Sequence, residues 1–179
     1  MTETGSAPEP HAHPVSRLRT LWLMLVTIVA PVLILDQASK FYVASHLRLY
    51  QEIPIVPHLL GLAYTLNSGA AFSLFANLPA EFRIGFLFTI TGIAIVVLTI
   101  LLAQAHEPSW QTVGFALILA GALGNLIDRI LRGRVIDFIH VHYYDWNYPI
   151  FNLADSAITI GVAILLIEGL GRSDRPRVG

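Results

Sequence analysis

The chain has 179 residues, of which 55% are hydrophobic and 13% charged, and its mean hydropathy is +0.64. Soluble domains carry roughly 25% charged residues, so this composition excludes an ordinary soluble protein and indicates an α-helical integral membrane protein. The net charge of −1 and the scattered basic residues argue against nucleic acid as a partner. Because the chain has no cysteine, disulfide bonds, a thiolate nucleophile and a Cys-ligated metal are excluded as well.

The first segment, residues 1–16, is polar and rich in proline, so we expect a disordered tail there. Its two histidines, His11 and His13, are interpreted as solvated side chains rather than metal ligands. An uncharged run over 20–35 follows and could be a signal peptide or a first span. A span is favoured because the apolar character continues beyond Asp36 and no small-residue cleavage site lies at the right distance.

Four segments are apolar and long enough to cross a bilayer whose hydrocarbon core is about 30 Å thick. They form a single four-span domain over 17–171, followed by a polar tail over 172–179. The predicted transmembrane helices cover about 20–41, 84–103, 110–130 and 150–170.

The segment between the first two predicted spans is apolar but contains Pro54, Pro57, Gly61, Gly69 and Pro79. Such residues would break a spanning helix and expose backbone groups to lipid. We therefore expect an extended element at the membrane surface, with a strand-like stretch over 61–75.

Four spans place both termini on one side of the membrane, and we expect that side to be the cytoplasm. Five of the 11 basic residues lie near the two chain ends and six on the other side, so the positive-inside rule alone does not decide the orientation. The choice depends on the basic residues near the chain ends, which directly adjoin the spans.

Small residues form a stripe along the third predicted span, at Ala116, Ala120 and Gly124, with Gly121 beside them. A stripe of this kind lets a neighbouring helix approach closely. We therefore expect this span to pack tightly against another.

A polar face ends the same span, because Asn125, Asp128 and Arg129 are spaced at i, i+3 and i+4. We interpret Asp128 and Arg129 as a structural pair, whereas Asn125 could bond across helices. Gly133 is expected to end the helix and to leave Asp137 on an extended segment at the membrane surface.

Asp155, near the start of the fourth predicted span, has two interpretations. A carboxylate there is often a helix cap, but Asn152 is already available for that role. The alternative is a pair with Asp137, since acids at membrane depth are costly and usually functional. Two carboxylates in one site keep one proton, so one can activate water while the other polarises a carbonyl.

Four motifs taken together resemble the bacterial lipoprotein signal peptidase family, signal peptidase II. They are "DQASK" from Asp36, "NSGAAF" from Asn67, "GALGNLIDRILRGRVIDFI" from Gly121 and "FNLADSA" from Phe151. The resemblance implies four transmembrane helices in the bacterial inner membrane and an active site near the outer face. It also implies a small extracytoplasmic β-cradle over about 42–79 and a loop over the active site, to both of which 133–148 would contribute.

The resemblance also implies roles for single residues. Asp137 and Asp155 would be the catalytic aspartates of an endopeptidase that cuts prolipoproteins before a diacylglyceryl-modified Cys. It implies contact with membrane lipid, a monomer, and no metal or other cofactor. Arg129 could then hold a lipid headgroup or a substrate carbonyl. The residues expected to line or support the site are Asn67, Asn125, Arg129, Asn152, Asp36, Lys40, Asp128 and Gly121.

Two other classes of function remain open from the residues alone. A small ion- or proton-coupled transporter could use Asp137 and Asp155 as a relay, although the halves of the chain show no self-similarity. A non-enzymatic membrane scaffold would explain the small-residue stripe but would leave both acids without a role.

Overall fold

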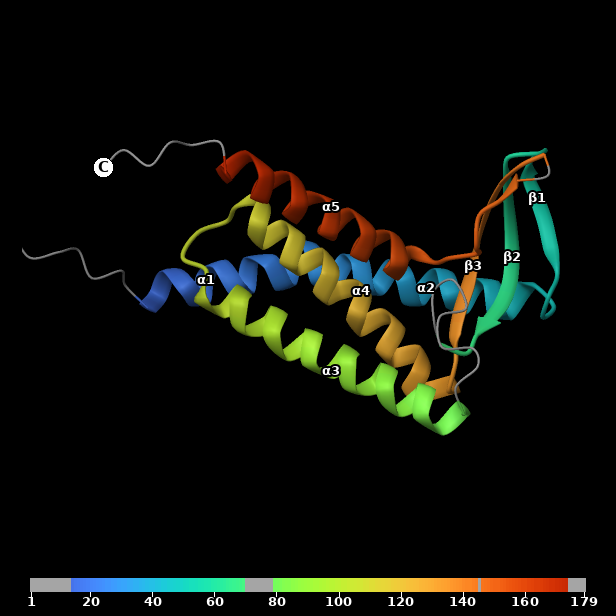
Figure 1. Ribbon diagram of the computed structural model, residues 1–179, viewed down its shortest axis with the longest axis horizontal. Coiled ribbons are helices and arrows are strands. Elements are labelled where there is room, and N and C mark those ends of the chain that lie inside the picture. The colour runs from blue at the N-terminus through green and yellow to red at the C-terminus, as the bar shows by residue number, and fades with distance from the viewer. Residues whose placement is uncertain (1–13, 70–78, 145, 174–179) are drawn as a thin grey trace, which may run out of the picture.

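The computed structural model describes residues 14–69, 79–144 and 146–173, and these form a helical bundle with a small sheet at one end (Figure 1). The helices are α1 (Pro14–Met24), α2 (Ala30–His46), α3 (Ala80–Gln104), α4 (Trp110–Arg132) and α5 (Leu153–Ser173), and a π-helical turn, Leu25–Val29, joins α1 to α2. In the described part of the chain, four continuous helical segments are long and apolar enough to cross a membrane, which confirms the predicted number. They are Arg17–His46, Ile84–Gln104, Trp110–Arg132 and Leu153–Gly171.

The first helical segment, from α1 to α2, is longer than the predicted span at both ends. It begins at Pro14, so residues 14–16 belong to a helix rather than to the tail expected over 1–16, and it continues to His46. Its π-helical turn comes just before Pro31, which occupies the first turn of α2. Proline cannot donate the backbone hydrogen bond of a regular helix, and a wider turn accommodates that loss without ending the helix.

Helix α4 lies against α2, α3 and α5, and its small residues allow the close contact with α5. A Cβ atom added to Gly121 would clash with the backbone oxygen of Ala154, and one on Gly114 would meet Gly161 O at 3.1 Å. The predicted tight packing of this span is confirmed. The helix begins with a capping box between Ser109 and Thr112.

The end of α4 sets the position of the sheet. Gly133 has φ +69°, a left-handed conformation that glycine adopts without steric cost, and it ends the helix as predicted. The chain then enters β3 (Val135–Tyr143), so Asp137 follows the helix end within a few residues.

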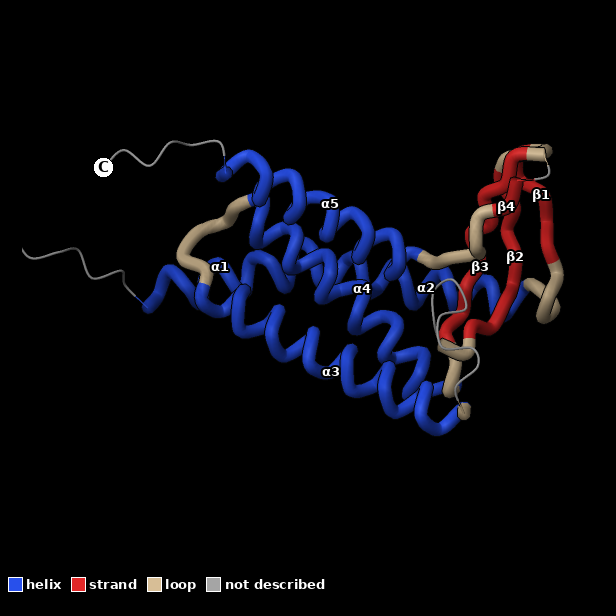
Figure 2. Tube along the Cα trace, viewed as in Figure 1, coloured by secondary structure: helices blue, strands red, loops and turns tan. Residues whose placement is uncertain are grey.

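The sheet is antiparallel, with strand order β1-β2-β3-β4. Strand β3 is joined to α2 by a buried apolar cluster of Val43, Ile136 and Phe138, whereas β1 is an exposed edge strand. The sheet therefore stands at the bundle end that is remote from the start of α1 and the end of α5 (Figure 2). The strands are β1 (Glu52–Val56), β2 (Leu60–Asn67), β3 (Val135–Tyr143) and β4 (Trp146–Asn147).

Of the segment 42–79 expected to form the cradle, 42–46 complete α2, and the strands among its described residues cover 52–56 and 60–67. The segment 133–148 contributes β3 and β4 to the sheet. The part of the strand-like stretch over 70–75, and the rest of the segment to 78, lies outside the described residues.

Candidate active site

Asp137 is the third residue of β3 and is 2% exposed. Both of its carboxylate oxygens accept hydrogen bonds from amide side chains. Asn67 Nδ2 donates to Oδ2 at 2.9 Å from the end of β2, and Asn152 Nδ2 donates to Oδ1 at 2.6 Å. The sheet and the start of α5 therefore fix the position of the carboxylate together.

Asp155 lies in the first turn of α5, where it is part of a helix cap. Asn152 Oδ1 accepts the backbone N–H of Asp155 at 2.9 Å, and Asp155 Oδ2 accepts the backbone N–H of Asn152 at 3.4 Å. The cap expected at Asn152 is present, but Asp155 takes part in it too. Its other oxygen, Oδ1, accepts a hydrogen bond from Asn125 Nδ2 at 2.8 Å.

Asn152 is the residue that joins the two acids. Its amide nitrogen donates to Asp137 while its amide oxygen accepts from the backbone of Asp155, and the side chain is fully buried. The neighbouring Phe151 binds β3, since its oxygen accepts the N–H of Phe138 at 3.0 Å and of Ile139 at 2.7 Å. The start of α5 is thereby fastened to the strand that carries Asp137.

The environment of Asp137 favours its protonated form. Burial, and next the negative charge of Asp155, raise the pKa of Asp137 from its ordinary value of 3.8 to about 6. The hydrogen bonds from Asn67 and Asn152, and the charge of Lys40, oppose this rise. A site that holds one proton between two carboxylates is the state that acid–base chemistry near neutral pH requires.

A buried charged cluster lies between α2 and α4, next to the segments that carry the two acids. Lys40 Nζ lies 2.8 Å from Asp36 Oδ2 and 3.1 Å from Asp128 Oδ2, and all three side chains are almost completely buried. Arg132 Nη1 adds a second cation, 2.7 Å from Asp128 Oδ1. Two carboxylates thus face two cations, which is the condition under which buried charges are tolerated.

This cluster holds both segments that carry the acids. Asp128 Oδ2 accepts the backbone N–H of Ile136 at 3.1 Å, and Asp36 Oδ1 accepts the backbone N–H of Ala154 at 2.9 Å. Ile136 and Ala154 directly precede Asp137 and Asp155 in the chain. Each buried carboxylate therefore positions the backbone next to one of the two acids.

Lys40 also connects the cluster to the site through Asn125. Its third donor reaches Asn125 Oδ1 at 3.1 Å, so the three N–H groups of the ammonium have three acceptors. Asn152 Nδ2 lies 3.3 Å from the same oxygen. With its oxygen occupied in this way, Asn125 presents its NH2 group to Asp155.

Arg129 does not pair with Asp128, so that prediction is wrong. Asp128 points to Lys40 and Arg132 instead, because the helix places Arg132 at i+4 on its side. Arg129 Nη1 reaches only the backbone oxygen of Asn125 at 3.4 Å, and its Nε atom is buried without a partner among the described residues. Unsatisfied donors of a cation beside two acids are suited to binding a polar group of a substrate.

Sequence reasoning missed three residues at the site. Gln37 donates to Asp36 and to the backbone oxygen of Gly124, both at 3.1 Å, and Thr65 donates to the backbone oxygen of Asp137 at 3.2 Å. The third is Arg132, which pairs with Asp128, and the i, i+4 spacing of these two residues could have revealed it. The other expected residues come together here, and Gly121 contributes by letting α5 approach α4.

Comparisons with known proteins agree with this arrangement. The profile of the family described as Signal peptidase (SPase) II matches residues 28–170. A lipoprotein signal peptidase of Pseudomonas fluorescens is 44% identical over 155 residues, which cover 85% of this chain and 87% of that protein. One from Photorhabdus laumondii is 39% identical over 161 residues, covering 90% and 93%.

Solved structures are similar as well. A bacterial membrane enzyme determined by the in meso method at 2.3 Å resolution has a TM-score of 0.77 and 32% identity, covering 90% of this chain and 94% of that one. A second, at 1.9 Å resolution, has a TM-score of 0.71 and 34% identity, covering 86% and 94%. The profile match and the relatives extend over the helices and strands that carry both acids, and this chain belongs to the signal peptidase II family.

Proposed function

We propose that this protein is an intramembrane aspartyl endopeptidase that removes signal peptides from prolipoproteins at the bond before a diacylglyceryl-modified Cys. One observation carries the proposal: Asp137 and Asp155, on separate elements, belong to one hydrogen-bonded network through Asn152. Family membership supplies the substrate class. The geometry supplies a pair of carboxylates with the surroundings that acid–base peptide hydrolysis needs.

The reaction uses one proton shared by the two acids. The ionised carboxylate takes a proton from a water molecule, whose oxygen attacks the scissile carbonyl carbon. The protonated carboxyl gives its proton to the carbonyl oxygen, which forms a neutral tetrahedral intermediate. Collapse of this intermediate re-forms the carbonyl, transfers a proton to the leaving amine and releases the signal peptide. The raised pKa of Asp137, about 6, makes it suited to hold the shared proton.

Amide side chains keep the pair in place during these transfers. Asn67, Asn125 and Asn152 donate to the carboxylates without being able to titrate, so they fix positions and leave the proton count to the acids. Arg129, with its unpartnered Nε, is suited to bind a substrate carbonyl or the phosphate of a membrane lipid.

The same arrangement supports an orientation in the bacterial inner membrane. Asp137 belongs to β3 and Asp155 to the first turn of α5. These elements meet at the end of the bundle that carries the sheet, whereas the start of α1 and the end of α5 lie at the opposite end (Figure 1). We infer that the termini are cytoplasmic and that the site opens near the outer face, where a lipidated substrate reaches it within the membrane plane. The enclosed network comes from a single chain, which supports action as a monomer.

Asp→Asn substitutions test the proposal, because asparagine keeps the shape and removes ionisation. With a lipidated prolipoprotein peptide and detergent-solubilised protein, Asp137→Asn, Asp155→Asn and the double variant should all fall to a similar low cleavage rate. Glu107→Gln changes an exposed acid and should retain full activity. Binding of the lipidated peptide, measured separately, should persist in all variants.

Substantial turnover by either single variant would overturn the aspartyl mechanism and would favour a relay of protons through the remaining acid. Arg129→Ala adds a second measurement. It should lower cleavage at normal protein abundance, since a hydrogen bond to a charged group contributes about 1.5–3 kcal/mol. A loss of folded protein instead would show that Arg129 has a structural role.

A further inference from the structure

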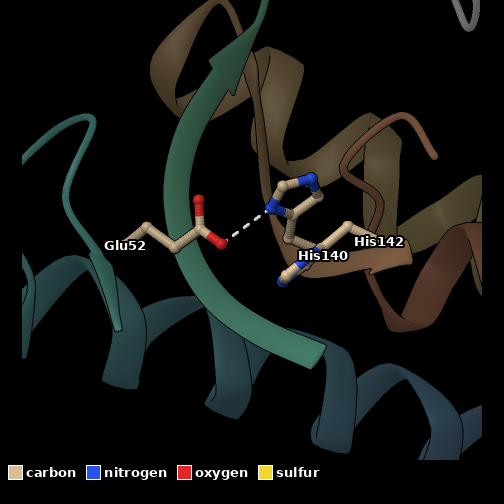
Figure 3. Close-up of side chains that lie close together, drawn as sticks. All are labelled: Glu52, His140 and His142. Atoms are coloured by element: carbon tan, nitrogen blue, oxygen red, sulfur yellow. Dashed lines mark hydrogen bonds and ion pairs between the residues drawn. The ribbon is translucent and has the colours of Figure 1, made fainter. Parts of the chain in front are cut away.

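A second group of side chains capable of chemistry lies on the sheet, apart from the two acids. Glu52 of β1 and His140 and His142 of β3 place one potential ligand atom each within 4.8 Å of the others (Figure 3). Glu52 Oε1 lies 2.7 Å from His140 Nδ1. The two imidazole rings have centroids 5.0 Å apart.

The register of the sheet explains why these residues meet. His140 and His142 are two positions apart on one strand, so both side chains lie on the same face. His140 pairs with Gly61 on β2, and Gly61 pairs with Pro54 on β1. The Glu52 side chain passes over Gly61, because a Cβ atom there would overlap Glu52 Oε1 and would meet its carboxyl carbon at 3.1 Å.

Glycine at position 61 of β2 therefore lets residues of β1 and β3, the strands on either side of β2, share a site. Any side chain on residue 61 would fill the space through which Glu52 reaches His140. Among the described residues, no hydrogen bond joins this cluster to the carboxylate of Asp137 or Asp155, whose partners are the amide side chains of Asn67, Asn125 and Asn152 and the backbone of Asn152. The cluster is thus separate from the reaction that the two acids perform.

We propose that Glu52, His140 and His142 form a binding site for a divalent transition metal of the Zn²⁺ class. Two imidazole nitrogens and one carboxylate oxygen match the borderline ligands that Zn²⁺ takes, with a water in the fourth position. Ligand atoms about 2.0–2.2 Å from a tetrahedral ion lie roughly 3.3 Å apart. The present ligand atoms lie within 4.8 Å of one another, so rotation of the exposed Glu52 side chain and of the two partly buried imidazoles is needed to reach this spacing.

The metal links β1 to β3 across β2. β1 is an edge strand whose residues are all exposed, and edge strands are held by few contacts. β3 carries Asp137, so a metal at this place stabilises the sheet that supports the active site. The expected effect is resistance to unfolding, since an ion that binds only the folded state stabilises it.

The alternative is a hydrogen bond between Glu52 and His140 without any metal. His142 distinguishes the two, because it has no part in that hydrogen bond but is the third ligand. His142→Ala leaves Glu52 and His140 paired and is expected to fold, yet it removes one ligand. Loss of a group that only hydrogen-bonds to a metal ligand typically costs 10–100-fold in metal affinity. Loss of a ligand itself should therefore cost at least that much.

The test uses the untagged full-length chain in detergent, with His11 and His13 replaced by Gln so that the N-terminal segment adds no ligands. Zn²⁺ is titrated against a chromophoric chelator, and Co²⁺ is added separately to record its visible absorption. We expect one equivalent of Zn²⁺ to bind, with a tetrahedral Co²⁺ spectrum and a higher unfolding temperature. His142→Ala, His140→Ala and Glu52→Gln should each weaken binding at least about tenfold.

His58→Ala is the matched control, since His58 is an exposed histidine of the same sheet region that stacks on Tyr144 and is not part of the cluster. Its affinity should equal that of the parent protein. Absence of a saturable equivalent, or binding that His142→Ala leaves unchanged, would overturn the proposal. Because the readouts are metal affinity and absorption, their failure is distinguishable from failure of the protease mechanism.

Discussion

Replacement of Asp137 by Asn should change the pH dependence of stability in a direction that the structure fixes. The pKa of Asp137 is about 6 in the folded protein and 3.8 without the surroundings, a difference of about two pKa units. One unit corresponds to about 1.4 kcal/mol, so keeping this carboxylate ionised costs the fold about 3 kcal/mol.

The sign follows from proton binding. Between pH 4 and pH 6 the folded state binds more protons at Asp137 than the unfolded state does, so stability falls as the pH rises. The stabilisation of the folded state by the protonated form of Asp137 is fully present below about pH 4 and is lost above about pH 6. Asn does not titrate, so Asp137→Asn should lack this fall. Relative to the parent, the variant should gain about 3 kcal/mol across the window.

The free energy of unfolding can be measured at several pH values by guanidinium titration in detergent micelles, followed by the fluorescence of the three tryptophans. Asp155→Asn removes the negative charge that raises the pKa of Asp137, so it should shrink the pH dependence. Glu107→Gln, an exposed acid, should leave the profile unchanged. Parallel profiles for the parent and Asp137→Asn would refute the reasoning.

Three further predictions concern the supporting structure. Lys40→Met should leave two buried carboxylates without a shared cation and cost about 3–5 kcal/mol, seen as a loss of folded protein in membranes; normal yield would contradict the charge assignment. Gly121→Ala should destabilise the protein by about 1–3 kcal/mol, because its Cβ overlaps the backbone of α5, whereas Gly92→Ala has open space and should not lower the melting temperature. A Cys at Ser45 should react with an impermeant thiol reagent outside intact cells, and one at Glu107 only after permeabilisation; the reverse pattern would invert the proposed topology.

The labelling site at the α3–α4 turn is Glu107 for a structural reason. Ser109, two residues further on, caps α4 through its side chain, and its replacement would disturb the start of the helix. Glu107 is exposed and lies outside both helices, so a Cys there reports accessibility alone.

Much of this protein follows from the sequence through short-range rules. Apolar runs of sufficient length predict four spans, since a helix in lipid must satisfy its backbone internally. The ends of helices are equally local: Gly133 ends α4 in a left-handed conformation, and Asn152 caps α5. The pair of acids was predicted from Asp137 and Asp155 lying at one membrane boundary, together with the motifs around them.

Contacts across the bundle could be decided only by the tertiary structure. Nothing local indicates that Asp128 faces Lys40 of α2 rather than its neighbour Arg129, because this depends on which helix lies against that side of α4. Burial then selects the partner, as a desolvated carboxylate needs a cation at hydrogen-bond distance. The meeting of Glu52 with His140, 88 residues apart, likewise requires the strand register and the missing side chain at Gly61. Sequence spacing describes neighbours along one element, whereas these sites exist only where separate elements pack.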